Sequence, residues 1–238
     1  MNPTEGVLRE AWDLYKAHWQ HLLMVALAVF AAVAVISLVL ALLFDRWFEA
    51  ILISLVSLIA TFWVQGALIR AVEDIRDGRA DLSFGETLGS VRSHLAAIIV
   101  AGVLAAIGII LGLILLVVPG LVLLTWWVLI IPVIVLEGRS AGESFGRSRE
   151  LVRGYGWNVF GVIVLTVLVL LGFRIVLDLV LFPLANEIQS LVTELIVGTV
   201  ATPFAVVTWT LLYYRLKGAK ESTPEAVPPG APPPPTTV

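Results

Sequence analysis

The chain has 238 residues, of which 59% are hydrophobic and only 14% are charged, and its mean hydropathy is +0.99. Soluble domains carry about 25% charged residues and disordered chains are poor in apolar ones, so this composition excludes both classes. The formal charge of −3 does not indicate a nucleic-acid partner, and the lack of cysteine excludes disulfides and thiolate metal sites. We therefore expect a polytopic membrane protein.

The chain opens with a segment, 7–16, whose apolar side chains recur at helical spacing. This pattern predicts a short amphipathic helix at the membrane interface. The acidic residues in the first 21 positions do not fit a signal peptide, so we expect the first long apolar run to be a retained membrane anchor.

Six apolar stretches are long enough, or nearly so, to cross about 30 Å of hydrocarbon as helices. Each run is continuous rather than alternating, which favours helices over the strands of a β-barrel. Tight connections at 45–49, Pro119-Gly120 and 183–190 pair the stretches as three hairpins. The predicted fold is an all-α membrane protein, a single domain over 1–217, with spans at 22–44, 50–69, 95–118, 121–136, 158–182 and 191–212.

The segments before the second and third hairpins repeat a pattern. Residues 85–92 match residues 142–149, and each copy begins with the Ser-x-x-Glu spacing of a capping box, Ser83 with Glu86 and Ser140 with Glu143. The N-terminus has a weaker version with Pro3 at the first helical position. We interpret the chain as three units, each a short interfacial amphipathic helix followed by a transmembrane hairpin.

The basic residues predict the orientation. Thirteen of fifteen fall in the N-terminal segment, the two segments between hairpins or the C-terminal tail, and only Arg46 and Arg174 lie toward the other side. This distribution predicts cytoplasmic N- and C-termini in the plasma (inner) membrane. The tail, 218–238, holds seven of the twelve prolines and is predicted to be disordered, as a spacer or a partner-binding segment.

Few charges enter or border the predicted spans. Arg174 and Asp178 are four residues apart and can pair on one helix face, with Glu194 at the same outer end. This cluster could bind a cation or a lipid head group, although a snorkelling pair that ends the span is the preferred interpretation. At the cytoplasmic end, Glu137 follows the fourth span and could bridge to an arginine on the next helix.

Three arginines on that helix are candidate contacts for lipid phosphates, because each basic side chain near an anionic surface adds about 1 kcal/mol. The simpler alternative is that they only set the orientation. The three residues are Arg147, Arg149 and Arg153.

Small residues and prolines carry structural predictions. The small-xxx-small spacing of the third span predicts close helix contact, in a central position or at a self-association face. Pro132 and Pro203 are expected to kink the fourth and sixth spans. The small residues are Gly102, Ala106, Gly108 and Gly112.

A stretch from Pro119 to Gly161 carries a family resemblance. It contains Trp126-Trp127, Glu137-Gly138, Ser144-Phe145, Arg147-Ser148, Leu151-Val152, Arg153-Gly154 and Trp157, and the last span closes with Leu211-Leu212-Tyr213-Tyr214-Arg215-Leu216-Lys217. These motifs resemble the glycerophosphoryl diester phosphodiesterase membrane domain and related uncharacterised six-span bacterial membrane proteins. Arg215 stands where that family usually has aspartate.

The resemblance implies a membrane module that, in some relatives, accompanies a separate phosphodiesterase domain. Such a domain needs a cluster of His, Glu and Asp around a metal, and three histidines near the membrane surface do not supply it. No motif for catalysis, metal or cofactor binding was found, so we expect a non-enzymatic protein without metal or cofactor.

Three functions follow from these observations. The first is a membrane protein that organises or binds membrane lipids or partner proteins. The second is a small transporter with a site among spans 4–6, which a wet midplane cavity lined by Gln65, Thr125 or Thr208 would favour. The weakest is a lipid-modifying enzyme.

Overall fold

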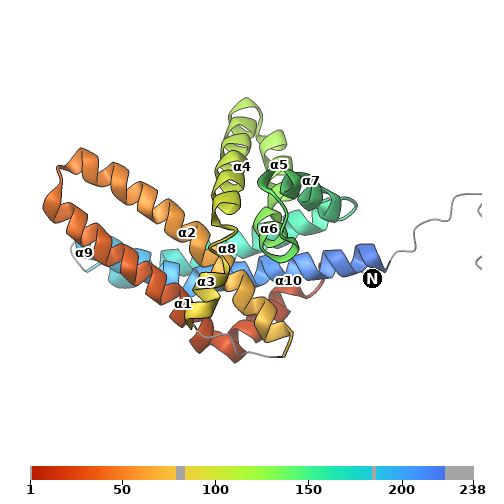
Figure 1. Ribbon diagram of the computed structural model, residues 1–238, viewed down its shortest axis with the longest axis horizontal. Coiled ribbons are helices and arrows are strands. Elements are labelled where there is room, and N and C mark those ends of the chain that lie inside the picture. The colour runs from red at the N-terminus through yellow and green to blue at the C-terminus, as the bar shows by residue number, and fades with distance from the viewer. Residues whose placement is uncertain (1, 79–83, 184–185, 223–238) are drawn as a thin grey trace, which may run out of the picture.

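The computed structural model describes residues 2–78, 84–183 and 186–222, and all regular structure in these ranges is helical (Figure 1). It has six helical stretches long and apolar enough to cross a membrane, which confirms the number of predicted spans. They are α1 (Val7–Leu43), α2 (Arg46–Arg76), α4 (Leu95–Leu115), α5 (Val117–Trp127) with α6 (Ile130–Glu137), α8 (Gly156–Leu181), and α9 (Asn186–Ile196) with α10 (Thr202–Glu221).

Helix α1 combines the first predicted amphipathic segment with the first span. The two parts meet at a kink, where His18 has the non-helical dihedrals φ −123° and ψ 22°. The prediction that Pro3 begins a helix was wrong, because the helix starts at Val7 after Gly6, whose φ of 74° suits glycine. The preceding turn is held by the side-chain oxygen of Asn2. This oxygen accepts one hydrogen bond from the Thr4 backbone N–H at 3.2 Å and a second from the Thr4 hydroxyl at 2.8 Å.

Short helices precede the second and third hairpins, as the repeat predicts. They are α3 (Phe84–Ser90) and α7 (Ala141–Val152). The capping box of α7 is confirmed: the Glu143 backbone N–H donates to Ser140 Oγ at 3.4 Å, and the Ser140 N–H donates to the Glu143 carboxylate at 3.0 Å. The Ser140 hydroxyl and N–H bonds lower the pKa of the Glu143 carboxyl. The matching Ser83 lies outside the described residues.

The turn of the second hairpin lies earlier than predicted. Helix α4 ends at Leu115 and α5 begins at Val117, so Pro119 and Gly120 lie in the first turn of α5 rather than in the connection. Proline is tolerated there because its missing N–H would have no helical partner at that position. Gly120 instead allows close contact with α4, since its Cα lies 3.0 Å from a Cβ built on Gly112.

Substituting Gly120 by alanine is expected to destabilise the protein by about 2 kcal/mol, because the added methyl group would lie 2.6 Å from the Leu113 backbone nitrogen. Thermal unfolding of the detergent-purified protein measures the effect. The matched control is Gly161→Ala in α8, where the methyl group would meet no atom within 4 Å. Equal unfolding midpoints for the two variants would contradict the close contact.

Both predicted proline interruptions occur, each with its own geometry. Before Pro132, the fourth span breaks into α5 and α6, and the buried Ser148 of α7 fills the gap. Its hydroxyl donates to the Trp126 carbonyl at 2.6 Å and accepts from the Leu129 N–H at 3.2 Å. Two backbone groups that the broken helix cannot pair are thereby satisfied.

The interruption at the second proline is a π-helical turn, Val197–Ala201, directly before α10. Pro203 cannot donate a backbone hydrogen bond, which favours a widened turn at this point. The turn is held from α1, because the Tyr15 hydroxyl donates to the Val200 carbonyl at 3.1 Å.

The C-terminal boundary also differs from the prediction. Helix α10 continues to Glu221, so residues 218–221, predicted to be disordered, are helical. Lys220 lies in this last turn and its ammonium group donates to the Arg153 carbonyl at 2.8 Å, which ties the helix end to α7. The prolines at 224–235 lie outside the described residues.

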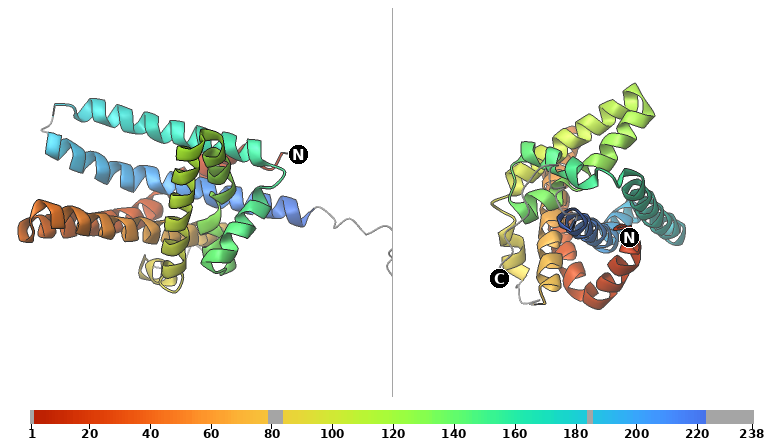
Figure 2. Two further views of the ribbon diagram at one scale, coloured as in Figure 1. Left: turned by 90° about the horizontal axis from the view of Figure 1, so that it is seen from above. Right: turned by 90° about the vertical axis from the view of Figure 1, so that its right-hand side faces the viewer.

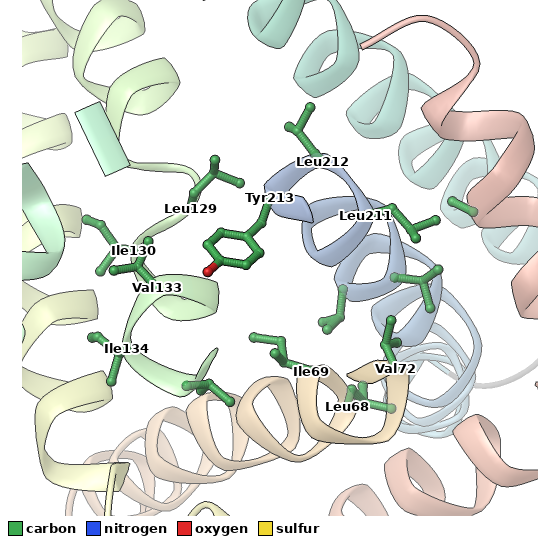
Figure 3. Close-up of a cluster of buried hydrophobic side chains, with 14 of the residues drawn as sticks. Leu68, Ile69, Val72, Leu129, Ile130, Val133, Ile134, Leu211, Leu212 and Tyr213 are labelled. Carbon is green, nitrogen blue, oxygen red and sulfur yellow. The ribbon is translucent and has the colours of Figure 1, made fainter. Parts of the chain in front are cut away.

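The core forms where the second helices of the three hairpins meet (Figure 3). The closing span Val192–Glu221, which ends in α10, is central: 61% of its most apolar stretch is buried, against 17% for α4. The alternative that the glycine-rich third span is central was therefore wrong. The labelled core residues come from α2 (Leu68, Ile69, Val72), the start of α6 (Leu129, Ile130, Val133, Ile134) and α10 (Leu211, Leu212, Tyr213).

Around this core, the second span of each hairpin contacts an amphipathic helical segment from another unit, and this happens three times. In the first, Trp63 of α2 donates to the Leu88 carbonyl of α3 at 3.0 Å. In the second, Trp127 of α5 packs edge-on against Phe145 of α7, with centroids 5.0 Å apart. In the third, α10 packs against the start of α1. The chain thus closes into a ring of three units.

The hairpins do not all point the same way. The α1–α2 and α8–α9 hairpins extend to the left in Figure 1, whereas α4–α5 rises away from them, and both views of Figure 2 show the same divergence. The far ends of the hairpins are mostly exposed, and the buried residues gather near the short helices. The fold therefore has a packed base with three apolar arms, two of which extend to the same side while α4–α5 points away from them.

Candidate functional site

Glu137, at the end of α6, is the centre of a polar cluster in the base. Its carboxylate accepts from Arg139 Nε at 2.8 Å, from Arg147 Nε at 3.1 Å to each oxygen, and from the Tyr213 hydroxyl at 2.9 Å. Only 10% of the Glu137 side chain and 18% of the Arg147 side chain are exposed. One carboxylate thus joins α6, α7 and α10.

The Arg147 side chain is bound within this cluster. Burial lowers its pKa, but the hydrogen bonds to Glu137 and Glu150 outweigh burial and raise the pKa above its ordinary value. Its Nη1 lies 3.2 Å from the Glu150 carboxylate, so the guanidinium is placed between two acids. Of the three arginines predicted to contact lipid phosphates, this one is already neutralised within the chain.

The other two arginines are exposed. The guanidinium carbon of Arg149 lies 4.2 Å from the ring centroid of Trp126, a cation–π contact. Arg153 is the C-terminal cap of α7 and is followed by Gly154, whose φ of 93° turns the chain toward α8. Both cations lie beside the carboxyl end of a helix, where positive charge is favoured.

An apolar groove begins beside these arginines, between α5 and the start of α8. It has a volume of about 570 Å³. Trp126 and Gly154 are part of its wall. Arg149 stacks on Trp126, and Arg153 precedes Gly154 in the chain, so both arginines neighbour residues that line the groove. The remaining lining residues are Val118, Leu121, Val122, Thr125, Gly156, Trp157, Asn158 and Phe160.

The outer charged residues also come together. Arg174 Nε lies 3.7 Å from the Asp178 carboxylate and Arg174 Nη1 lies 3.9 Å from that of Glu194. Thr193 donates its hydroxyl to Asp178 at 3.1 Å. The three charged side chains are between 43% and 74% exposed, so they lie at the surface of the chain.

The small residues of α4 make contacts inside the chain. Gly102 packs against the Phe62 ring of α2, and Gly108 packs against Trp127 of α5. Gly112 faces Gly120, as described above. Ala106 is exposed. Self-association through this face stays a prediction.

Two roles were not predicted from the sequence. Ser148 bridges the helix break, and the signal was a serine among the apolar positions of α7. Arg215, where the resembling family has aspartate, fixes the N-terminus: its guanidinium donates to the Glu10 carboxylate and to the carbonyls of Pro3 and Glu5. The distance along the chain between Arg215 and these partners hides the contact from local patterns.

Helix length and hydropathy define a polytopic helical membrane protein. No family model, curated protein or solved structure matches this chain. The resemblance to the glycerophosphoryl diester phosphodiesterase membrane domain therefore rests on the quoted motifs alone.

Proposed function

We propose that this protein is a non-enzymatic membrane protein that binds anionic lipids in the groove between α5 and α8. The observation that carries the proposal is that two exposed arginines, Arg149 and Arg153, neighbour the lining residues Trp126 and Gly154 of an apolar groove of about 570 Å³. A lipid has the matching chemistry, with a negative phosphate joined to apolar chains. The arginines would bind the phosphate, and Leu121, Val122 and Phe160 would contact an acyl chain.

The groove lies at the depth where we predict the lipid head groups of the cytoplasmic leaflet. Trp157 is 86% exposed at the start of α8, and tryptophan is enriched where membrane meets water. In this arrangement α3 and α7 lie at the cytoplasmic interface of the plasma (inner) membrane, and both termini are cytoplasmic. The exposed members of the thirteen basic residues, such as Arg149 and Arg153, then lie on the side of the anionic lipids.

The transporter alternative has less support. Two of its three candidate polar groups are bonded within their own helices. Thr125, which lines the groove, donates to the Leu121 carbonyl at 2.8 Å, and the fully buried Thr208 donates to the Phe204 carbonyl at 2.9 Å. A lipid-modifying enzyme remains the weakest alternative, because the arginines at the groove have no nucleophile or acid–base pair assigned beside them.

Replacing Arg149 and Arg153 together by alanine is expected to weaken binding of phosphatidylglycerol about thirtyfold. Two cation–phosphate contacts of about 1 kcal/mol each account for that factor. Native mass spectrometry of the full chain in detergent, titrated with phosphatidylglycerol and with phosphatidylcholine of the same acyl chains, measures both affinities.

The matched control is Arg46→Ala with Arg174→Ala, which removes the same charge at the far ends of the arms. We expect this control to leave the preference for phosphatidylglycerol unchanged. If both double variants lose the preference equally, or if the intact chain shows none, the proposed site is wrong.

A further inference from the structure

A second hollow lies far from the arginine groove, between α1, α2 and α9. Its volume is about 310 Å³, and it contains apolar residues together with three hydroxyl groups and one carboxylate. The residues used below are Phe30, Val33, Ser37, Ser57, Thr61 and Glu194.

The hollow lies along the apolar arms. At 1.5 Å per residue, Ser57 is about 16 Å from the start of α2, inside the candidate span Arg46–Arg76. Glu194 is the third residue of the candidate span Val192–Glu221, near its outer end. A carboxylate within a candidate span is costly and is typical of a binding or transport site.

The described charges around Glu194 leave one negative charge in excess. Arg174 is shared between two carboxylates, 3.7 Å from Asp178 and 3.9 Å from Glu194. Asp178 also accepts the Thr193 hydroxyl, whereas Glu194 lines the hollow and is 74% exposed. The hollow therefore attracts a single positive charge.

The walls specify the rest of the ligand. The aromatic ring of Phe30 can lie against a cation, and Val33 offers apolar contact. Ser37 and Ser57 add hydroxyl oxygens, and Thr61, whose hydroxyl donates to the Ser57 carbonyl at 2.7 Å, keeps its oxygen lone pairs as acceptors. A strongly hydrated metal ion would lose water to these apolar walls and is a poor match for the hollow. A weakly hydrated organic cation fits the combination of acceptor oxygens and apolar groups better.

We propose that this hollow binds a lipophilic organic monocation, whose charge is paired with Glu194 and whose apolar groups contact Phe30 and Val33. The site is separate from the lipid groove, because the two hollows share no lining residue. It is therefore independent of the function proposed above.

Equilibrium dialysis of the full chain in detergent micelles tests the proposal with tetraphenylphosphonium as the probe. We expect saturable binding of one cation per chain after subtraction of empty micelles. Glu194→Gln should weaken that binding at least tenfold without changing the thermal unfolding midpoint, since the side chain is exposed. Glu49→Gln, which removes a carboxylate from the first turn of α2 outside this hollow, should leave it unchanged.

Tetraphenylborate, which has the same shape and the opposite charge, separates charge recognition from plain apolar partition. We expect no saturable binding of this anion. Equal cation affinities for Glu194→Gln and the unchanged chain, saturable binding of the anion as tight as that of the cation, or no saturable cation binding would each overturn the proposal. The Arg149 and Arg153 double variant should bind the cation normally.

Discussion

Replacing Glu137 by glutamine is expected to lower the free energy of unfolding by about 3 kcal/mol. The carboxylate accepts hydrogen bonds from Arg139, Arg147 and Tyr213, and only 10% of it is exposed. Glutamine fits the space but leaves the largely buried Arg147 guanidinium without its main countercharge, and the loss of one partner from a buried ion pair costs about 3–5 kcal/mol. Thermal or denaturant unfolding in detergent measures the change.

The chain offers a matched control on the same guanidinium. Glu150 also pairs with Arg147, at 3.2 Å, but its side chain is 64% exposed, so Glu150→Gln should cost less than about 1 kcal/mol. Adding Arg147→Leu to Glu137→Gln should recover part of the lost stability, because the unpaired charge is then removed. A Glu137→Gln variant as stable as Glu150→Gln would show that the cluster does not hold the base together.

Replacing Ser148 by alanine is the second substitution with a large expected effect, about 2–3 kcal/mol of lost stability. Its hydroxyl satisfies both the Trp126 carbonyl and the Leu129 N–H at the break between α5 and α6. Alanine leaves these groups unpaired in a buried setting, where each unsatisfied polar group costs about 1–3 kcal/mol. Unfolding of the purified variant measures the loss.

Ser144 on the same helix provides the comparison. It is equally buried, but its hydroxyl donates to the Ala141 carbonyl of its own helix at 2.6 Å and bridges no break. Ser144→Ala should therefore cost less than about 1 kcal/mol. The bridging role would be wrong if the two alanine variants unfolded at the same midpoint.

Several local features of the fold could be predicted from nearby residues in the sequence. The capping box at Ser140, the interruption at Pro132 and the charge pair of Arg174 with Asp178 all depend on residues within four positions of each other. Helical geometry fixes such contacts before any tertiary structure forms. The choice of Arg147 rather than Arg149 as the partner of Glu137 was left open, because it depends on how α7 packs against α6 and α10.

The sequence by itself determined that this is a membrane protein with six apolar helices, because hydropathy adds up along each segment independently of the others. Only the tertiary structure decided that α10 rather than the glycine-rich α4 is central, that α4–α5 diverges from the other hairpins, and that Arg149 and Arg153 border a groove. Those properties depend on the shapes of side chains from helices distant in sequence. Hydropathy carries no information about the angle between two helices or about which of their faces meet.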